Sequence, residues 1–380
     1  MQPDLKSNMT SAAFAFRGYN VTNLGRTPEL LEHPAYGAIV ERHLKLAAEV
    51  FESATSKRID LVQRVRLREE SSLETYGEAL CLISGSSLAQ LEILKEFFGI
   101  AFNTAKLTVG YSLGEIIALV AAGVYSLDAL LVPILKFSDD CVELAREVRM
   151  GVVFSRGPIL DVEQIERLCV EVTSRQQGTI GISTYLGPNT VLVLGQRGTL
   201  DLLKSAIREK FGKEVHLKED SHRWPPIHTQ IVRQKCVPDR ASVLLETVPG
   251  GHCVPSIPIV SCVTGHPSYN DFNSRHILAD WIVQPQRLWA VLERLLVSDI
   301  DLLIHVGPEP NLIPATMARL SNNVEEQMKS RLHLRAVSTI VRARPWLAQY
   351  ISKHASLLRA PQIVNVKLED WLLENAPPAA

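Results

Sequence analysis

The 380-residue sequence predicts an α/β fold in which a small ferredoxin-like unit interrupts a larger body. Three observations support this fold class. A β-prone run at 107–109 passes through a glycine-flanked serine directly into a helical pattern. Residues 148–218 follow the order strand, helix, strand, strand, helix, strand. Short apolar runs typical of buried strands lie at 14–16, 257–262 and 301–306, with helical patterns between them.

The N-terminal part predicts one strand followed by helices. Phe14 to Phe16 is the first strand, and it ends at Arg17-Gly18. Apolar residues at helical spacing then cover 28–53, with a hinge near Pro34. A second helix is predicted over 78–98, and the charged stretch 64–70 before it reads as solvated surface.

The inserted unit is predicted element by element from its periodicity. Its elements lie between the glycine-flanked serine and everything downstream, so the unit interrupts the body. Helices are expected at 162–174 and 199–211, and strands at 151–155, 179–185, 190–195 and 214–217.

The C-terminal part returns to the larger body. Strands are expected at 257–262 and 301–306, and helices at 275–283, 286–297, 308–320 and 344–359, with a polar tail after them. We therefore expect a body made of residues 10–147 and 219–340, an insert at 148–218, and a C-terminal tail at 341–380.

Composition and charge exclude several classes of protein. Forty basic and 41 acidic residues give a net charge of −1, which argues against a protein built mainly to bind nucleic acid. Six cysteines without a CxxC pair indicate a reducing compartment and no zinc cage. No apolar export signal precedes residue 10, and the apolar stretch 116–137 contains Gly123, Asp128 and Pro133. We expect a cytoplasmic protein with no membrane span.

The glycine-flanked serine is the most informative local pattern. In Gly110-Tyr111-Ser112-Leu113-Gly114, the glycines permit a tight turn that projects the serine from the sheet edge. The helix that follows directs its free N–H groups to the same place, where an oxyanion would form. This layout is typical of a nucleophile elbow. The alternative is a glycine-rich turn with an incidental serine.

The same residues carry a family resemblance. Residues 110–124 (GYSLGEIIALVAAGV) resemble the GHSLGE…ALVAAG signature of acyltransferase domains. These are the malonyl-CoA:acyl-carrier-protein transacylases and the loading domains of polyketide and fatty-acid synthases. The resemblance runs from Phe14 to Trp371 and implies an α/β-hydrolase-like body with the ferredoxin-like small subdomain. Further matching segments are Pro226-Ile227-His228-Thr229, residues 281–289, Val306-Gly307-Pro308, and the tail segments 337–340 and 364–371.

The resemblance implies acyl transfer in fatty-acid or polyketide biosynthesis through an acyl-serine. Ser112 would be the nucleophile and His228 its base, with His222 a nearby rival. The main-chain N–H groups of Leu113 and Tyr19 would form the oxyanion hole. A main-chain carbonyl orients the histidine in this family, so no aspartate is needed. The implied substrates are an acyl-CoA and the phosphopantetheine thiol of an acyl carrier protein, with no bound cofactor or metal and a monomeric chain.

Several positions depart from the family pattern around the acyl group. Tyr111 replaces the histidine before the nucleophile, and the loop after the first strand reads GYNVT instead of GQGSQ. The arginine that clamps the malonyl carboxylate aligns with Lys136, which offers a point charge in place of a two-pronged fork. The alternative for Lys136 is a side chain that merely extends from a helix end into solvent.

Three more departures surround the histidine and the acyl pocket. Cys262 replaces a family asparagine, and Trp281 replaces the glutamine whose carbonyl steadies the histidine. Ile227 stands where malonyl-selective members usually have phenylalanine. Together these changes predict an acyl pocket reshaped from the malonyl form, and the acyl group stays open.

Two other functions fit part of the pattern. An esterase or thioesterase uses the same elbow and adds a carboxylate with a late histidine such as His305, His333 or His354. A docking module would keep the fold without catalysis. For a transferase, the basic residues Arg208, Lys210 and Lys213 are candidates for contact with an acidic carrier protein.

Overall fold

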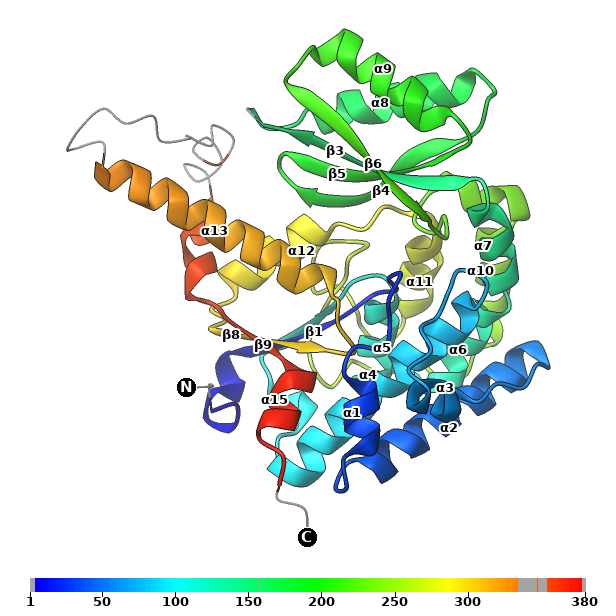
Figure 1. The fold of residues 1–380 in the computed structure, drawn as a ribbon, viewed down its shortest axis with the longest axis vertical. Coiled ribbons are helices and arrows are strands. Elements are labelled where there is room, and N and C mark those ends of the chain that lie inside the picture. Colours follow the sequence, from blue (N-terminus) through cyan, green and yellow to red (C-terminus); the bar gives the residue numbers. More distant parts are fainter. Residues whose placement is uncertain (1–3, 157, 334–346, 348–353, 378–380) are drawn as a thin grey trace.

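The structure is a computed structural model that describes residues 4–156, 158–333, 347 and 354–377. Figure 1 shows a large α/β body with a smaller unit stacked on one end of it. The small unit is formed by the green middle part of the chain, and both the earlier and the later parts build the body.

A five-stranded sheet forms the centre of the body. Its strand order is β7-β2-β1-β8-β9, and every pairing is parallel. Within β1, Phe14 and Phe16 join the core on one face, while Ala13 and Ala15 join the core on the other. The sheet is therefore covered on both faces, as parallel sheets require. The strands are β1 (Ala12–Phe16), β2 (Leu107–Gly110), β7 (Ile259–Val260), β8 (Leu302–Val306) and β9 (Val364–Lys367).

Helices cover both faces of this sheet. The expected hinge near Pro34 is a break between α1 and α2, and the apolar stretch 116–137 divides into α5 and α6. The helices are α1 (Thr27–Glu32), α2 (Gly37–Thr55), α3 (Leu61–Arg66), α4 (Tyr76–Phe98), α5 (Leu113–Ala121), α6 (Leu127–Leu135), α7 (Ser138–Ala145), α10 (Val237–Thr247), α11 (Ser274–Val283), α12 (Leu288–Val297), α13 (Leu312–His333) and α15 (Leu368–Glu374). In the described part of the chain, no helix is long and apolar enough to span a membrane.

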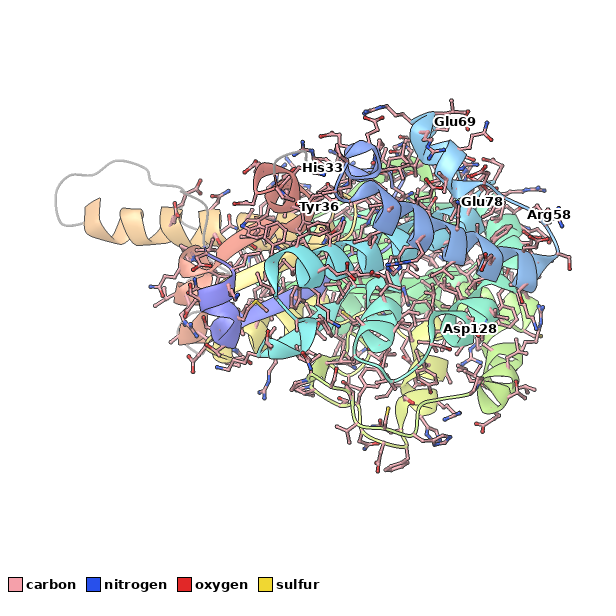
Figure 2. The ribbon with its side chains drawn as sticks, turned by 90° about the horizontal axis from the view of Figure 1, so that it is seen from below. His33, Tyr36, Arg58, Glu69, Glu78 and Asp128 are labelled. Atoms are coloured by element: carbon pink, nitrogen blue, oxygen red, sulfur yellow. The ribbon has the colours of Figure 1, made fainter. Side chains whose placement is uncertain are left out.

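The short helix α3 was not predicted. The charged stretch 64–70 is mostly exposed, as expected, but it begins inside α3, whose Leu61, Val62 and Val65 are buried. Figure 2 shows Glu69 and Arg58 near the edge of the molecule, beside the blue helices. Short 3-10 segments lie at η1 (Lys6–Ser11), η2 (Phe102–Thr104), η3 (Gln230–Lys235) and η4 (Ala355–Gln362).

The small unit has its own antiparallel sheet and its own core. Its strands occur in the spatial order β4-β5-β3-β6, with both helices on one face of the sheet. This arrangement is the ferredoxin-like plan, so the predicted fold class is confirmed. The elements are β3 (Val148–Ser155), α8 (Val162–Ser174), β4 (Ile180–Gly187), β5 (Thr190–Gln196), α9 (Thr199–Phe211) and β6 (Val215–Arg223).

The described C-terminal residues 354–377 pack against the body. Strand β9 pairs with β8, from Leu302↔Val364 to His305↔Lys367. Helix α15 then places Trp371 against Phe98, with ring centroids 4.7 Å apart. The helix predicted at 308–320 starts at Leu312 and continues to His333. The helix predicted at 344–359 lies mostly outside the described residues, and its described end is part of η4.

Candidate active site

Ser112 lies on a sharp turn between β2 and α5. Its backbone angles, φ 54° and ψ −119°, are unusual for a residue with a side chain. Any larger residue would clash at the neighbouring glycines. A Cβ at Gly110 would lie 2.1 Å from the Gly114 carbonyl carbon, and one at Gly114 would lie 2.2 Å from Phe16 O. The strained turn is therefore fixed by close backbone contacts on both sides.

His228 faces Ser112 from the chain segment that follows the small unit. Its Nε2 lies 2.7 Å from Ser112 Oγ, and its Nδ1 lies 2.6 Å from the Trp281 carbonyl oxygen. Its main-chain N–H donates to Ile282 O at 2.8 Å. Because a carbonyl can only accept, Nδ1 carries the proton and Nε2 is free to accept from the Ser112 hydroxyl. The geometry is that of a serine with its general base.

Burial keeps His228 neutral. It lowers the pKa of the imidazole to about 4, although the Trp281 carbonyl acts in the opposite direction. The side chain is only 4% exposed, so water does not stabilise the charged form. A neutral imidazole at pH 7 is the form that can take a proton from serine.

This depressed pKa predicts how reactivity depends on pH. The rate of Ser112 acylation should stay level from roughly pH 8 to about pH 5 and fall only as the pH approaches 4. In the unfolded chain a histidine titrates near 6.5. The free energy of unfolding contributed by His228 is therefore complete above about pH 6.5 and decreases as the pH falls toward 4.

Single-turnover acylation followed by intact-mass spectrometry measures this profile. Urea unfolding at each pH is the control, because it separates loss of the base from loss of the fold. If the acylation rate fell with a midpoint near pH 6.5 while the protein stayed folded, the lowered pKa of His228 would be contradicted.

The residues expected to form the oxyanion hole border Ser112. Leu113 is the first residue of α5, a position whose N–H has no acceptor within the helix. Tyr19 lines the Ser112 cleft and follows Gly18, where a Cβ would lie 2.7 Å from Tyr111 O. The loop after β1 therefore lies directly against the elbow.

Arg17 fixes the loop after β1 through hydrogen bonds, a role that the sequence did not reveal. Its guanidinium is fully buried and donates to Gly18 O at 2.8 Å and to Asn23 Oδ1 at 2.7 Å. Desolvation lowers its pKa to about 10, and the carboxylates of Glu309 and Glu369 act against this shift. An arginine that ends an apolar strand was the only sequence signal for it.

Ser112 opens onto a cleft of about 300 Å³ between the body and the small unit. The small unit contributes β3 and β5 side chains such as Met150 and Leu194, and the body contributes Tyr76 and Tyr111. Asp220 is the charged side chain among the lining residues, and none of these residues is a lysine or an arginine. The side chain of His222 is exposed, is hydrogen-bonded to Asp220 and does not line the cleft.

Lys136 does not reach this cleft. It caps the C-terminal end of α6 with an exposed side chain and does not line the cavity. The next residue, Phe137, is buried and faces the interior. The position of Lys136 therefore does not support the expectation that it replaces the carboxylate-clamping arginine.

Trp281 supports both members of the pair. Its carbonyl accepts from His228, its indole Nε1 donates to Ser112 O at 3.1 Å, and its ring meets the imidazole edge-on at 5.0 Å. The loss of the family's glutamine side chain at this position thus leaves the carbonyl in place and adds an indole contact.

Gln286 is a further site residue that the sequence did not indicate. Its side-chain amide lies 3.2 Å from His228 Nδ1, and a half-turn of the amide brings its oxygen to that N–H. Its main chain joins the two units: Gln286 N donates to Ser183 O at 2.8 Å, and Tyr185 N donates to Gln286 O at 2.9 Å. The body residue next to His228 is therefore tied to strand β4.

Tyr111 forms part of the cleft wall, whereas Cys262 is not among the lining residues. The Tyr111 hydroxyl lies 2.9 Å from Thr184 Oγ1, a second link to β4. Cys262 is buried and its N–H donates to Glu115 Oε2 at 2.9 Å. Burial raises the pKa of Glu115 to about 7. Glu115, which belongs to the elbow motif, thus fixes the chain after β7 and does not touch the reacting atoms.

Comparisons with known proteins confirm the resemblance and the fold. No family model matches the chain. A malonyl CoA-acyl carrier protein transacylase of Bacillus subtilis (strain 168) is 25% identical over 304 residues, which is 79% of this chain and 87% of the relative.

Solved structures agree with this similarity. FabD from Acinetobacter baumannii has a TM-score of 0.65 at 19% identity, covering 82% of this chain and 91% of its own. A malonyl-transacylase solved in complex with the acyl-carrier protein of a type II polyketide synthase has a TM-score of 0.63 at 22% identity, covering 81% and 92%.

Proposed function

We propose that this chain, a relative of the malonyl-CoA:acyl-carrier-protein transacylases, is an acyltransferase of fatty-acid or polyketide biosynthesis. It moves an acyl group from coenzyme A to the phosphopantetheine thiol of an acyl carrier protein. The observation that carries this proposal is the 2.7 Å contact of Ser112 Oγ with His228 Nε2 on a strained elbow.

The first step forms the acyl-enzyme. His228 Nε2 takes the Ser112 proton as Oγ attacks the thioester carbon, and the N–H groups of Leu113 and Tyr19 stabilise the oxyanion. The C–S bond then breaks, and the leaving CoA thiolate receives the proton from His228. Trp281 O stabilises the transient imidazolium through Nδ1.

The second step reverses the chemistry with a different thiol. The carrier's thiol gives its proton to His228, and its sulfur attacks the acyl-serine carbonyl carbon. The bond to Oγ breaks, and Ser112 recovers its proton from the imidazolium. Neither step consumes a cofactor, because the serine itself is the acyl carrier.

The arrangement of histidines supports this dyad over an α/β-hydrolase triad with a late histidine. His305 is buried in β8 and its Nε2 lies 2.8 Å from Asn365 Oδ1. His354 pairs with Glu293, and the side chain of His333 lies outside the described residues. The Nδ1 partner of His228 is a carbonyl instead of a carboxylate.

The remaining expectations complete the proposal. We infer a cytoplasmic monomer that works on separate carrier proteins. The basic residues Arg208, Lys210 and Lys213 lie on or just after α9, which covers the face of the small sheet away from the body. They do not line the Ser112 cleft, so their part in carrier docking is not supported by their position.

Transfer to a carrier tests the proposal. The purified chain is incubated with an acyl-CoA and a phosphopantetheinylated carrier protein, and both are weighed by intact-mass spectrometry. We expect an acyl adduct on the enzyme and then on the carrier. Ser112→Ala should abolish the enzyme adduct and lower transfer by about a thousandfold or more. Ser205→Ala, at an exposed serine of α9, is the matched control.

Two results would contradict acyl transfer to a carrier and favour another function. Fast release of free acid without a carrier would favour a thioesterase that uses the same dyad. No adduct from any acyl-CoA would favour a docking module that has kept the fold.

A further inference from the structure

An apolar chamber lies in the body beside the Ser112 cleft. Helices α5, α6, α10 and α11 surround it with side chains that include Ile116, Leu130, Ala241 and Leu278, and Phe137 joins them from the turn between α6 and α7. Its other walls are also hydrocarbon or aromatic, apart from the Cys141 thiol, whose pKa burial raises to about 12. The thiol is therefore uncharged near neutral pH, and the chamber carries no charge of its own.

The chamber adjoins the reacting groups. Tyr76 and Ile227 line both the chamber and the cleft. Ile227 immediately precedes His228, and Trp281, which holds both members of the dyad, forms another chamber wall. Tyr76 and Ile227 therefore form the boundary that an acyl chain attached to Ser112 Oγ would cross to enter the chamber.

Within the described part of the chain, no cationic side chain lines this space to pair with a carboxylate. None of the residues lining the chamber or the cleft is a lysine or an arginine, and Asp220 makes the cleft slightly acidic. Lys136 is exposed at the end of α6. Arg240 stacks on the Phe137 ring at 4.8 Å, but its guanidinium is half exposed and paired with Asp140 at 2.6 Å. An unpaired buried carboxylate is strongly disfavoured.

The dimensions favour a slender group. The chamber measures about 40 Å³, compared with about 300 Å³ for the cleft. We propose that the acyl group carried by Ser112 is uncharged and aliphatic, and that its chain fills this chamber. The inference rests on the proposed acyl transfer and names its substrate class, a short straight-chain acyl-CoA in place of malonyl-CoA.

The test compares acyl donors on the intact chain. Acetyl-, butyryl-, hexanoyl- and malonyl-CoA are each supplied, and acylation of Ser112 is followed by intact mass under single-turnover conditions. We expect butyryl- or hexanoyl-CoA to exceed malonyl-CoA by at least about tenfold in kcat/KM. Each methylene that enters the chamber should add about fourfold until the chamber is full, since its burial contributes about 0.8 kcal/mol.

Two variants probe the chamber itself. Phe137→Arg places a guanidinium inside it and should shift the malonyl-to-butyryl ratio toward malonyl by at least about tenfold. Ala241→Leu narrows the chamber and should lower the rate with hexanoyl-CoA while sparing acetyl-CoA. It keeps the test informative if Phe137→Arg does not fold. Lys136→Ala, at the exposed neighbour, is the matched control and should leave every ratio unchanged.

The outcomes separate this inference from the proposed function. Malonyl-CoA as the preferred donor, with Lys136→Ala selectively reducing its use, would overturn the inference and leave acyl transfer intact. A lack of adduct from all four donors would instead remove the proposed function.

Discussion

Replacing His228 with alanine is expected to lower the rate of Ser112 acylation by about a thousandfold. The substitution removes the acceptor that lies 2.7 Å from Ser112 Oγ, and no other lining residue replaces it. Asp220, the carboxylate in the cleft, is already engaged by His222 and Trp224. Single-turnover acylation by intact-mass spectrometry measures the loss.

The control for this experiment is the nearby histidine. His222→Ala changes an exposed imidazole that does not line the cleft, so its acylation rate should match that of the unaltered chain. A loss of less than about tenfold in His228→Ala would mean that another group activates the serine.

The second large effect is expected from Gly114→Ala. The new Cβ would lie 2.2 Å from Phe16 O and 2.8 Å from Arg17 O, both in the backbone at the end of β1. Backbone atoms cannot rotate away as a side chain does, so either the elbow or the strand must move. We expect the free energy of unfolding to fall by about 4 kcal/mol or more, with loss of acylation.

Urea unfolding measures this change. Gly181→Ala is the matched control, because the nearest atom to its new Cβ is Thr229 Cβ at 4.0 Å, an ordinary contact. A fall of less than about 1 kcal/mol in Gly114→Ala would show that the turn can relax, and the strain argued for Ser112 would then be small.

The sequence predicted the elements whose signals are local. Helices α8 and α9 begin and end at the predicted residues, because each has a complete apolar stripe. Strand β7 starts only at Ile259 because Pro258 cannot donate to a ladder, and it ends at Val260 just before a turn at 262–264. Strand β9 escaped notice because only Val366 of its four residues is buried, and its partner β8 is far away in the sequence.

The residues of the candidate site also differ in how well local sequence signals predict them. Ser112 followed from the elbow motif, and His228 followed only from the family resemblance. Arg17 and Gln286 could not be predicted, because Arg17 also donates to Pro308 O and Gln286 lies beside His228, and both contacts join segments that are distant along the chain. Lys136 and Phe137 lie in the turn after α6, where no helical period predicts which side chain points inward; Lys136 is exposed and Phe137 lines the apolar interior.

The paired main-chain hydrogen bonds of Gln286 with Ser183 and Tyr185 have a consequence for how substrates are chosen. They join the small unit to the body at the residue beside His228, so the two walls of the cleft are held together close to the catalytic pair. Less binding energy is then needed to order this part of the cleft around an acyl group. Exchanging a few wall residues should therefore change the preferred acyl group without rebuilding the catalytic pair.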